Sequence, residues 1–509
     1  MKLGSFDVDI QKDAVDGGSG VLRPSRICYL AIISTTFWAL VLFLPSSTQG
    51  GDGIASVLFK PSTFSIPLFS SVTAAPPASA AVLPEAGKED RSVTSDDDRC
   101  AGRYIYMYDL PPRFNTDLLA ECGKLDIWMD MCPYVANHGM GQALGDEAGA
   151  FSDRGWYATN QFMLDVIFHG RMKAYDCLTS DPSRAAAAFV PFYASLDGGR
   201  YMWNSTSLRD ALALEFLDWL TRRPEWRAAG GGHFFVAGRT AVDFTRKSGG
   251  NGWGTSLLRN PTVQNMTVLV LETVAWSRSN VAVPYPTYFH PEAAADVAAW
   301  QGRVRKAERK WLFSFAGAPR PGNTRTVRAQ IIQQCGASGR CSLYRCGGVG
   351  AKANCYSPGG VMRLMESSTF CLEPRGDSLT RRSTFDAILA GCIPVFFHPG
   401  SAYTQYTLHL PEDPNKYSVL IMHTDITDRN VSIEDTLSRI SPETVKAMRE
   451  EVIRLIPRVV YADPVQARRL QGRLRRRRGG GHSSGGGPTA TRVGWHGALI
   501  HQAGGHIFA

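Results

Sequence analysis

Three arginines and two hydroxyl residues gather in one segment between two apolar runs. In FCLEPRGDSLTRRSTFDAILAGCIPVFF (370–397), a helix-like stretch follows the loop that holds Arg375, Ser378, Thr380, Arg381 and Arg382. Backbone N–H groups and the dipole at a helix N-terminus favour an anion, and cations are unfavourable there unless an anion lies among them. The segment therefore predicts a phosphate-binding loop. The alternative is a basic surface cluster whose helix has an ordinary serine cap.

A second expected strand ends in a similar loop. FAGAPRPGNTR carries Gly317, Arg320 and Arg325, and glycine and arginine at two strand ends are typical of a nucleotide crevice in a parallel sheet. Asp386 lies one to two turns into the expected helix, where it can accept hydrogen bonds from a ribose; a solvated carboxylate is the alternative. The chain contains neither G-x-x-x-x-G-K-[ST] nor G-x-G-x-x-G, so P-loop kinases and nicotinamide enzymes are not indicated.

The elements that must position these loops alternate between strand-like and helix-like segments. Such alternation predicts an α/β fold with parallel sheets. It occurs twice, on either side of a helical connector at 291–310, and predicts two Rossmann-like domains facing a cleft, over residues 100–300 and 301–463. The expected strands are 103–109, 185–197, 233–238, 267–272, 311–317, 368–374 and 392–397, and the expected helices are 159–178, 207–223, 326–335 and 380–391.

The N-terminal region predicts a membrane anchor. Residues 27–44 carry no charge, and as a helix they span roughly 27 Å, enough for a thin bilayer. Arg23 and Arg26 precede them, so residues 1–26 are expected in the cytosol and the rest in the lumen. A cleaved secretory signal is the alternative, although no small-x-small site follows the apolar run. Residues 45–99, rich in Ser, Pro, Ala and Gly, read as a flexible stem.

Two further features agree with a lumenal location. Asn204, Asn265 and Asn430 begin glycosylation sequons. Ten of the eleven cysteines follow the expected anchor. Four of them, which lack the C-x2-C spacing of zinc sites and favour disulfides over a metal, are Cys335, Cys341, Cys346 and Cys355.

The net charge of +9 is local. Seven arginines between residues 468 and 478 account for most of it, so a basic tail explains the charge better than a nucleic-acid-binding face does. The tail, residues 464–509, has no apolar period and looks disordered.

Several long motifs occur in this chain in one order: YMYDLPPRFN, YATNQFMLDVIFHGRMKAYDCLT, FVPFYASLD, VPYPTYFHP, RKWLFSFAGAPRPGNT and FCLEPRGDSLTRRSTFDAILAGCIPVFFHPGSAY. With them the chain resembles, over roughly residues 100–463, the exostosin-like glycosyltransferases of family 47, and among them the plant xyloglucan galactosyltransferase (KATAMARI) type. The resemblance implies an inverting, Golgi-anchored type II enzyme of GT-B fold, without a cofactor. Such an enzyme would transfer galactose from UDP-galactose to xylose on xyloglucan and associate with other wall glycosyltransferases.

The resemblance also implies a donor site. Asp386 matches the acidic residue that the family places in this helix, although an arginine precedes it by four residues here and by three in wider exostosins. Metal-dependent sugar transferases use an Asp-x-Asp pair, which this chain has only at Asp7/Asp9 and Asp96/Asp98, so stabilisation by arginines without a metal is expected. The implied donor-binding residues are Arg320, Gly376, Asp377, Ser378, Thr380, Arg381, Arg382 and Asp386.

Inversion by direct displacement requires a general base, expected from the first half. The candidates are Asp243, His233, Asp197 and Glu272, each of which has a helix cap or a buried hydrogen-bond partner as its alternative reading. Asp243 leads because its segment follows a strand. Around it the branch usually reads GRITWDF, whereas this chain has GRTAVDF and lacks the tryptophan.

Three points stay open on the sequence. The aromatic residues of PYPTYFHP (Tyr285, Tyr288 and Phe289) either stack on an acceptor glycan or pack in the core. The donor sugar is galactose or, alternatively, galacturonic acid or arabinopyranose. Because the family normally continues with further helices where this chain turns to arginine and glycine, a catalytically weakened endomembrane scaffold is the non-enzymatic alternative.

Overall fold

The structure is a computed structural model whose described residues all belong to one compact unit, Ser95–Ala509. The expected cytosolic tail, anchor, stem and basic tail lie outside them, as do Arg320, Arg325 and Cys355. Over the part that is described, no helix is both long and apolar enough to cross a membrane. The described residues are 100, 102–145, 149–152, 154–228, 232–247, 249–274, 279–319, 326–346 and 357–463.

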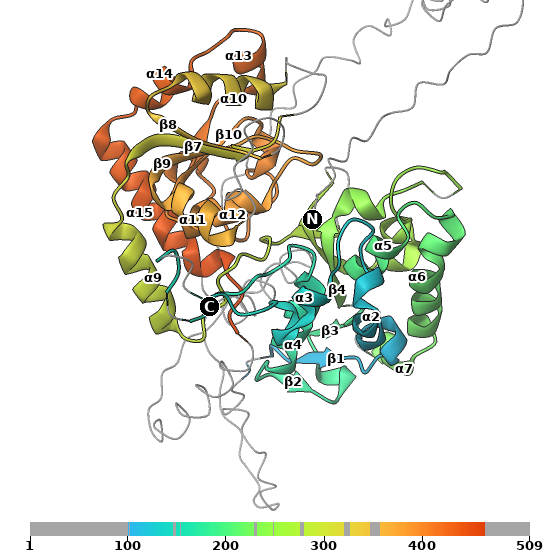
Figure 1. Cartoon of the computed structure of the whole chain (residues 1–509). Helices are drawn as coiled ribbons and strands as arrows, with labels where there is room; N and C mark the ends of the chain where they lie inside the picture. Colours follow the sequence, from blue (N-terminus) through green and yellow to red (C-terminus); the bar gives the residue numbers. More distant parts are fainter. Residues whose placement is uncertain are drawn as a thin grey trace, which may run out of the picture. The chain divides into compact units, whose positions relative to one another are not determined.

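Six parallel strands form the sheet of the first half, in the order β2-β1-β3-β4-β5-β6. Strands β1 to β4 are labelled in Figure 1. The expected strand 267–272 is β5, and the expected strand 233–238 continues to residue 240 in β4. The strands are β1 (Ile105–Met107), β2 (Leu178–Thr179), β3 (Ala187–Phe189), β4 (His233–Thr240), β5 (Thr267–Glu272) and β6 (Asn280–Ala282). The helices are α2 (Thr116–Ala120), α3 (Cys132–Val135), α4 (Leu164–Lys173), α5 (Ala194–Arg200), α6 (Thr206–Thr221), α7 (Pro224–Ala228) and α8 (Pro261–Gln264), with the 3-10 helix η6 (Ala241–Phe244) after β4.

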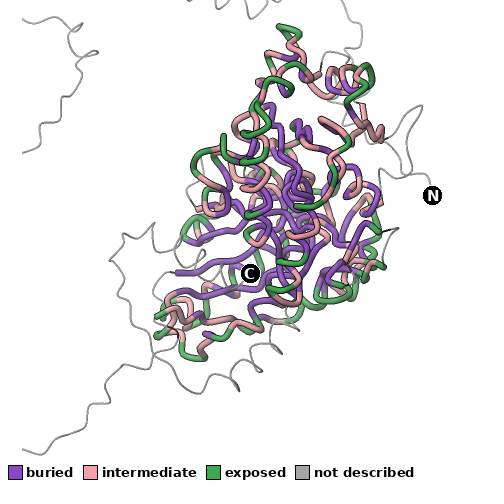
Figure 2. Tube along the Cα trace, turned by 90° about the vertical axis from the view of Figure 1, so that its left-hand side faces the viewer, coloured by how far each residue is buried: buried purple, intermediate pink, exposed green. Residues whose placement is uncertain are grey.

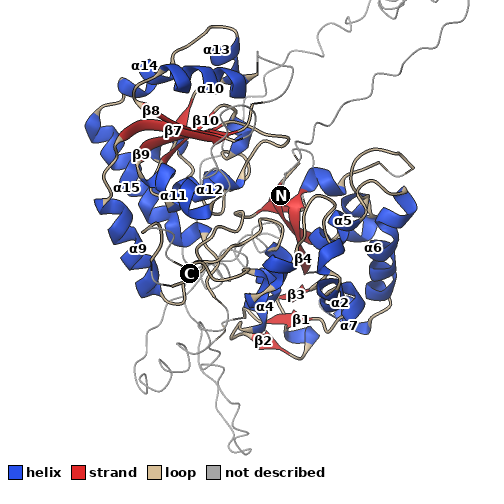
Figure 3. Cartoon of the chain, in the orientation of Figure 1, coloured by secondary structure: helices blue, strands red, loops and turns tan. Residues whose placement is uncertain are grey.

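Five parallel strands form the second sheet, in the order β11-β10-β9-β7-β8. Helices cover both of its faces, with α10, α13 and α14 on one side and α11, α12 and α15 on the other (Figure 3). The strands are β7 (Trp311–Gly317), β8 (Cys341–Arg345), β9 (Ser368–Glu373), β10 (Ile393–Phe396) and β11 (Val419–Leu420). The helices are α9 (Ala294–Lys306), α10 (Val327–Ala337), α11 (Pro358–Glu366), α12 (Arg382–Leu389), α13 (His423–Thr427), α14 (Ile433–Ser438) and α15 (Pro442–Val459).

Both sheets share one winding. Taken in chain order within each half, the neighbouring strands run 2-1-3-4-5, with β6 added at the edge of the first sheet. This is a doubly wound order, in which ligands bind beyond the carboxyl ends of the strands where the order reverses. The prediction of an α/β fold with parallel sheets is therefore confirmed.

One expected strand is wrong in its extent. The strand over 185–197 ends at Phe189, and Asp197 lies instead inside helix α5. Pro191 explains the early end, because proline has no N–H to give to a neighbouring strand.

A single hydrophobic cluster contains side chains of both sheets, such as Phe189 and Leu271 from the first and Phe313 and Val395 from the second. Figure 2 shows the buried segments running through the interior of the described part. After α15 the chain returns to the first half, where the backbone N–H of Asp463 donates to the carbonyl of Pro291. The two halves are therefore joined by core packing as well as by the chain.

Every described cysteine is in a disulfide bond. The Cys335–Cys341 bond confirms that these two residues form a disulfide, while Cys355 lies outside the described residues. The other disulfide bonds in which both cysteines are described are Cys100–Cys177, Cys122–Cys132 and Cys371–Cys392. The sequon residues Asn204, Asn265 and Asn430 are all exposed.

Candidate active site

The switch point of the second sheet lies between β7 and β9, because these neighbouring strands continue to opposite sides of the sheet. Their carboxyl ends are Gly317 and Glu373. The loop after β9 leads directly into α12, which begins at Arg382. The predicted phosphate-binding loop, residues 374–381, therefore lies at the edge where this class of sheet binds ligands.

Arg381 packs against the backbone of that loop. It is the N-cap residue of α12, and a Cβ atom at Gly376 would lie 1.3 Å from its Nη2 atom. A glycine is thus required at 376 for the guanidinium to lie where it does. The Nε atom of Arg381 is buried and makes no hydrogen bond within the described part of the chain, so this guanidinium has a donor to offer to a ligand.

Arg382 and Asp386 form an ion pair on one face of α12, with 3.4 Å between Nε and Oδ2. The guanidinium of Arg382 lies 3.6 Å from the centre of the Tyr288 ring and donates to the carbonyl of Thr159, both in the first half. Among the described residues, Nη2 of Arg382 and Oδ1 of Asp386 are buried without a hydrogen-bond partner. Because buried polar atoms are nearly always paired in folded proteins, these two atoms mark a place for a polar ligand.

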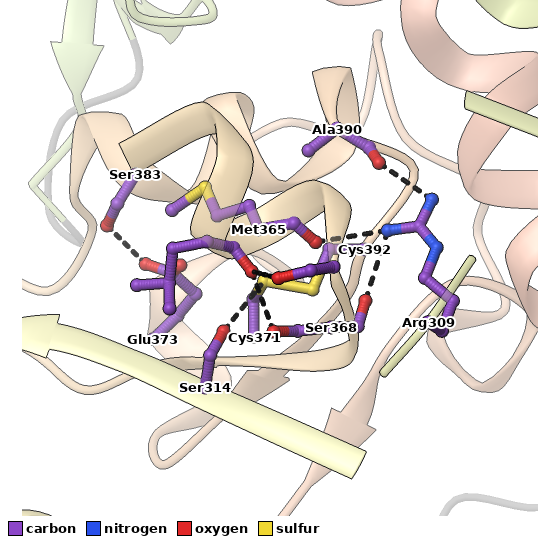
Figure 4. The surroundings of a disulfide bond; sticks show 11 residues. Arg309, Ser314, Met365, Ser368, Cys371, Glu373, Ser383, Ala390 and Cys392 are labelled. Carbon is purple, nitrogen blue, oxygen red and sulfur yellow. Dashed lines mark hydrogen bonds between the residues drawn. A yellow bond between two sulfur atoms is a disulfide. The ribbon is translucent and has the colours of Figure 1, made fainter. Parts of the chain in front are cut away.

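Glu373 completes this group and was missed on the sequence. It is the last residue of β9, is buried and accepts a hydrogen bond from the Ser383 hydroxyl (Figure 4). The pKa of Glu373 is raised to about 8, chiefly by burial; the Ser383 hydrogen bond opposes this change and the nearby Asp386 carboxylate contributes to it. Burial likewise raises the pKa of Asp386 to about 6, against the opposing effect of Arg382. The sequence signal that could have identified Glu373 as a site residue is its position at the end of an expected strand, just before the loop.

The Cys371–Cys392 disulfide holds this part of the second sheet together. It joins β9 to the residue before β10, and the Arg309 guanidinium beside it donates to the carbonyls of Met365, Ser368 and Ala390 (Figure 4). The two strands on either side of α12 are therefore covalently tied, which fixes the ends of the loop that carries Arg381.

Glu272 joins the two halves. This buried residue ends β5, and its carboxylate accepts hydrogen bonds from the Ser378 hydroxyl (2.6 Å) and from the backbone N–H groups of Leu379 (3.0 Å) and Thr380 (3.1 Å). It also accepts one from the Tyr285 hydroxyl at 2.7 Å. Burial raises its pKa, although these hydrogen bonds oppose the change. With four donors around it, Glu272 anchors the loop.

This anchoring corrects two expectations about the loop. The N–H groups of Leu379 and Thr380 serve the Glu272 carboxylate, so they are not the ones that meet a phosphate. Ser378 and Thr380 do not cap α12, whose N-cap residue Arg381 makes no side-chain cap hydrogen bond. The Thr380 hydroxyl donates instead to the carbonyl of Ser401. Arg375 and Asp377 lie at the exposed tip of the loop.

Asp243 lies in η6, three residues beyond the end of β4. Thr240, the last residue of β4, pairs with Glu272 across the sheet, so the two candidate bases follow adjacent strand ends. The Trp253 indole donates to Oδ1 of Asp243 at 2.7 Å, and the N–H of Thr255 donates to its backbone carbonyl. Burial raises the pKa of Asp243, while Arg239 and the side-chain hydrogen bonds from Trp253 and Thr240 oppose the change. A carboxylate with a raised pKa suits a general base.

The other two base candidates are engaged elsewhere. His233 is the first residue of β4, at the opposite edge of the sheet, where it contacts the Tyr108 hydroxyl at 2.9 Å. Burial lowers its pKa to about 4. Asp197 pairs with Arg200 at 3.2 Å inside α5, and burial raises its pKa to about 6. The structure thus brings Asp243 and Glu272 together at adjacent strand ends and leaves His233 apart from them.

The aromatic residues of PYPTYFHP are largely used for packing. Tyr285 and Phe289 are buried, which rules out their stacking on an acceptor in this conformation. Tyr288 lies under the Arg382 guanidinium. In the described ranges, no three or more His, Cys, Asp or Glu side chains are grouped so as to hold a metal ion.

Comparisons with known proteins identify the family of this chain. The model of the exostosin GT47 domain matches residues 99–437. The xyloglucan galactosyltransferase MUR3 of Arabidopsis thaliana is 45% identical over 89% of this chain and 81% of its own length. The probable xyloglucan galactosyltransferase GT12 of the same plant is 46% identical over 72% of this chain and 73% of its own. A pneumococcal O-GlcNAc transferase, GtfA, has a TM-score of 0.26 and 8% identity over 53% of this chain and 60% of its own, too weak a similarity to bear on the fold. On the domain match and the identity to these plant enzymes, the chain belongs to the exostosin GT47 family.

Proposed function

We propose that this chain is an inverting galactosyltransferase that moves galactose from UDP-galactose to xylose residues of xyloglucan. The observation that carries the proposal is the 45% identity over 89% of the chain to an enzyme named for this reaction. Each half has a doubly wound sheet, and Glu272 at the end of β5 in the first half accepts a hydrogen bond from Leu379 in the loop of the second half. This arrangement supports a GT-B organisation, with donor and acceptor bound between the halves.

The donor diphosphate is bound by Arg381 and Arg382 in this proposal. Both guanidinium groups have buried N–H donors that make no hydrogen bond within the described part of the chain. Guanidinium groups match phosphate oxygens in geometry and charge. The Oδ1 atom of Asp386 is buried and has no hydrogen-bond partner among the described residues, and in this proposal it accepts hydrogen bonds from the ribose hydroxyls. Arg320 is the further donor-binding residue expected from the sequence, and it lies outside the described residues.

Asp243 acts as the general base. The acceptor hydroxyl oxygen attacks the anomeric carbon of galactose, its proton passes to the carboxylate of Asp243, and the bond from the anomeric carbon to UDP breaks. The charge that develops on the leaving diphosphate is stabilised by Arg381 and Arg382, which supports a mechanism that needs no divalent metal. No cofactor takes part in this scheme.

We also propose that the enzyme is a single-pass type II protein of the Golgi membrane with its catalytic part in the lumen. The four disulfide bonds between described cysteines support an oxidising compartment, and the exposed sequon residues allow glycosylation. Association with other wall glycosyltransferases in that membrane is part of the same proposal.

The test is a donor assay on the detergent-solubilised full-length chain. Galactose-free xyloglucan is incubated with UDP-galactose, UDP-galacturonic acid or UDP-arabinopyranose, with and without EDTA, and the product is analysed for mass and linkage. Transfer of galactose alone, with inversion and in the presence of EDTA, is expected. Preference for another donor would refute the galactose assignment, and loss of transfer in EDTA would refute the metal-free mechanism.

A further inference from the structure

A hollow of about 430 Å³ opens on the first half of the molecule. Its lining includes Trp203 and Trp253 together with the polar residues Asn204, Thr206 and Asn251. The residues come from two separate segments, the turn before α6 and the loop after η6. The hollow is thus formed by tertiary packing rather than by one loop.

Three indole rings form a cluster here, and two of them, Trp203 and Trp253, line the hollow. The rings of Trp128 and Trp253 are stacked, with 6.1 Å between their centres, and Trp203 lies edge-on to both, at 6.5 Å from Trp128 and 5.4 Å from Trp253. Trp203 is 63% exposed. Because an exposed indole leaves a large apolar surface in water, a cluster with such a ring at its edge is typical of a binding surface.

The side chains that line the hollow around the rings are mostly uncharged. Of the lining side chains that the structure describes, Arg209 is the charged one, and its Nη1 atom donates to the carbonyls of Gly252 and Gly254. The remaining polar groups are amides and hydroxyls. Flat apolar rings bordered by neutral hydrogen-bonding groups match a neutral sugar, which presents C–H groups on its faces and hydroxyls at its edges.

The cluster is also continuous with the candidate base. Trp253 contributes one ring to the cluster and donates its indole N–H to Oδ1 of Asp243. The next residue, Gly254, has a φ of +75°, and a Cβ atom there would lie 2.2 Å from the backbone oxygen of Asp243. A ligand held on these rings would therefore lie beside the segment that positions Asp243.

We propose that Trp128, Trp203 and Trp253 form a docking site for the glucan backbone of the acceptor polysaccharide. Glucose units stack on the indoles and donate to and accept from Thr206 and Asn251, which holds the chain while a xylose branch reaches Asp243. This inference rests on the proposed function, because it takes the occupant to be the acceptor.

The binding test uses a probe that is not a substrate. Cellohexaose, a neutral glucan without xylose, is titrated into the detergent-solubilised full-length chain by calorimetry. Trp203→Ala is expected to weaken binding about tenfold, as loss of one stacking ring implies. Leu214→Ala is the matched control, because Leu214 is also exposed (52%) but lies on α6 away from the lining residues. Equal affinity in wild type and Trp203→Ala would overturn the proposal.

A kinetic test separates this proposal from the proposed function. Trp203→Ala is expected to raise KM for galactose-free xyloglucan about tenfold and to leave kcat and KM for UDP-galactose unchanged. If galactose is transferred but this variant matches wild type in both assays, the docking site is refuted and the function stands. If no galactose is transferred but Trp203→Ala still binds cellohexaose more weakly than wild type does, the proposed function is refuted and the glycan-binding surface stands.

The alternative occupant of the hollow is a glycan attached to Asn204, which begins a sequon and lines the site. Cellohexaose binding is therefore repeated with Asn204→Gln. If the wild type and this variant both bind cellohexaose, with dissociation constants that agree within about threefold, the result supports acceptor docking. Binding by Asn204→Gln alone would show that the protein's own glycan covers the rings in the native enzyme, and would overturn the proposal.

Discussion

Two carboxylates at adjacent strand ends have different surroundings, and this difference decides their roles. Glu272 accepts four hydrogen bonds, two of them from backbone N–H groups of the loop 378–380. Asp243 accepts side-chain hydrogen bonds from Trp253 and Thr240. A base must accept the proton of the acceptor hydroxyl, and the smaller number of hydrogen bonds to Asp243 favours it over Glu272.

Substitution by the matching amides tests this assignment. Asp243→Asn keeps an acceptor for Trp253 but removes the base, so kcat is expected to fall by about 10²- to 10⁴-fold. Glu272→Gln keeps one acceptor oxygen for the loop and is expected to retain kcat within about tenfold. Initial rates at saturating UDP-galactose and xyloglucan measure both. A larger loss of kcat in Glu272→Gln than in Asp243→Asn would identify Glu272 as the base instead.

Glu373 makes the stability of the fold dependent on pH. Burial raises its pKa from 4.5 to about 8, so between these values the folded chain holds a proton that the unfolded chain has released. The free energy of unfolding therefore declines as pH rises through this range. Glu373→Gln is expected to have the same melting temperature as wild type at pH 5 and a higher one at pH 8. A difference between the two proteins that does not change with pH would contradict this account.

At the scale of elements, the turn from β9 into α12 determines where Arg381 lies. Gly376 lies so close to the Arg381 guanidinium that any side chain there must displace it. Glu272 holds the loop from one side, and the Cys371–Cys392 disulfide ties the strands on either side of α12. The position of the arginine is thus set by the whole turn.

Gly376→Ala tests this arrangement. The added Cβ is expected to displace the Arg381 guanidinium and to weaken UDP binding about tenfold, since a hydrogen bond to a charged group contributes about 1.5–3 kcal/mol. Calorimetric titration with UDP measures the change. Gly302→Ala in α9 is the matched control, because a Cβ there meets no atom within 4 Å. Unchanged UDP affinity in Gly376→Ala would argue against Arg381 as a diphosphate ligand.

At the scale of the whole described unit, the two sheets share one core. The hydrophobic cluster includes residues of both, and the chain after α15 returns to the first half. There the hydroxyl of the fully buried Tyr461 donates to the carbonyl of Pro284. The backbone carbonyl of Tyr461 accepts a hydrogen bond from Nδ1 of His290. The two halves are therefore expected to unfold together.

Tyr461→Ala tests this coupling. Removal of a buried aromatic ring costs about 3–5 kcal/mol, so the melting temperature should fall by several degrees while calorimetry still shows one transition. Tyr461→Phe, which removes the hydroxyl alone, should give a smaller decrease. Two separate transitions in the wild-type chain would mean that the halves unfold independently.

Local sequence patterns predicted much of the fold. The strands β4, β5, β7, β9 and β10 and the helices α4, α6, α9, α10 and α12 all lie on segments expected from apolar periodicity and turn residues. The strand expected over residues 185–197 was too long, because the apolar run continues past Pro191 into a helix. Apolar content alone does not separate a buried strand from a buried helix, so that boundary was wrong.

The sequence by itself determined the family, the alternation of strands and helices, and the residues of the arginine-rich loop, because these depend on residue types and their spacing. Only the tertiary structure decided which partners those residues have. In the folded chain the backbone N–H groups of the loop donate to Glu272, and Glu373 lies beside Asp386. His233 contacts Tyr108, apart from Asp243 and Glu272. The indoles of Trp128, Trp203 and Trp253 form a cluster beside Asp243. The physical reason is that hydrogen bonds and burial depend on contacts between segments far apart in the chain, which local patterns do not specify.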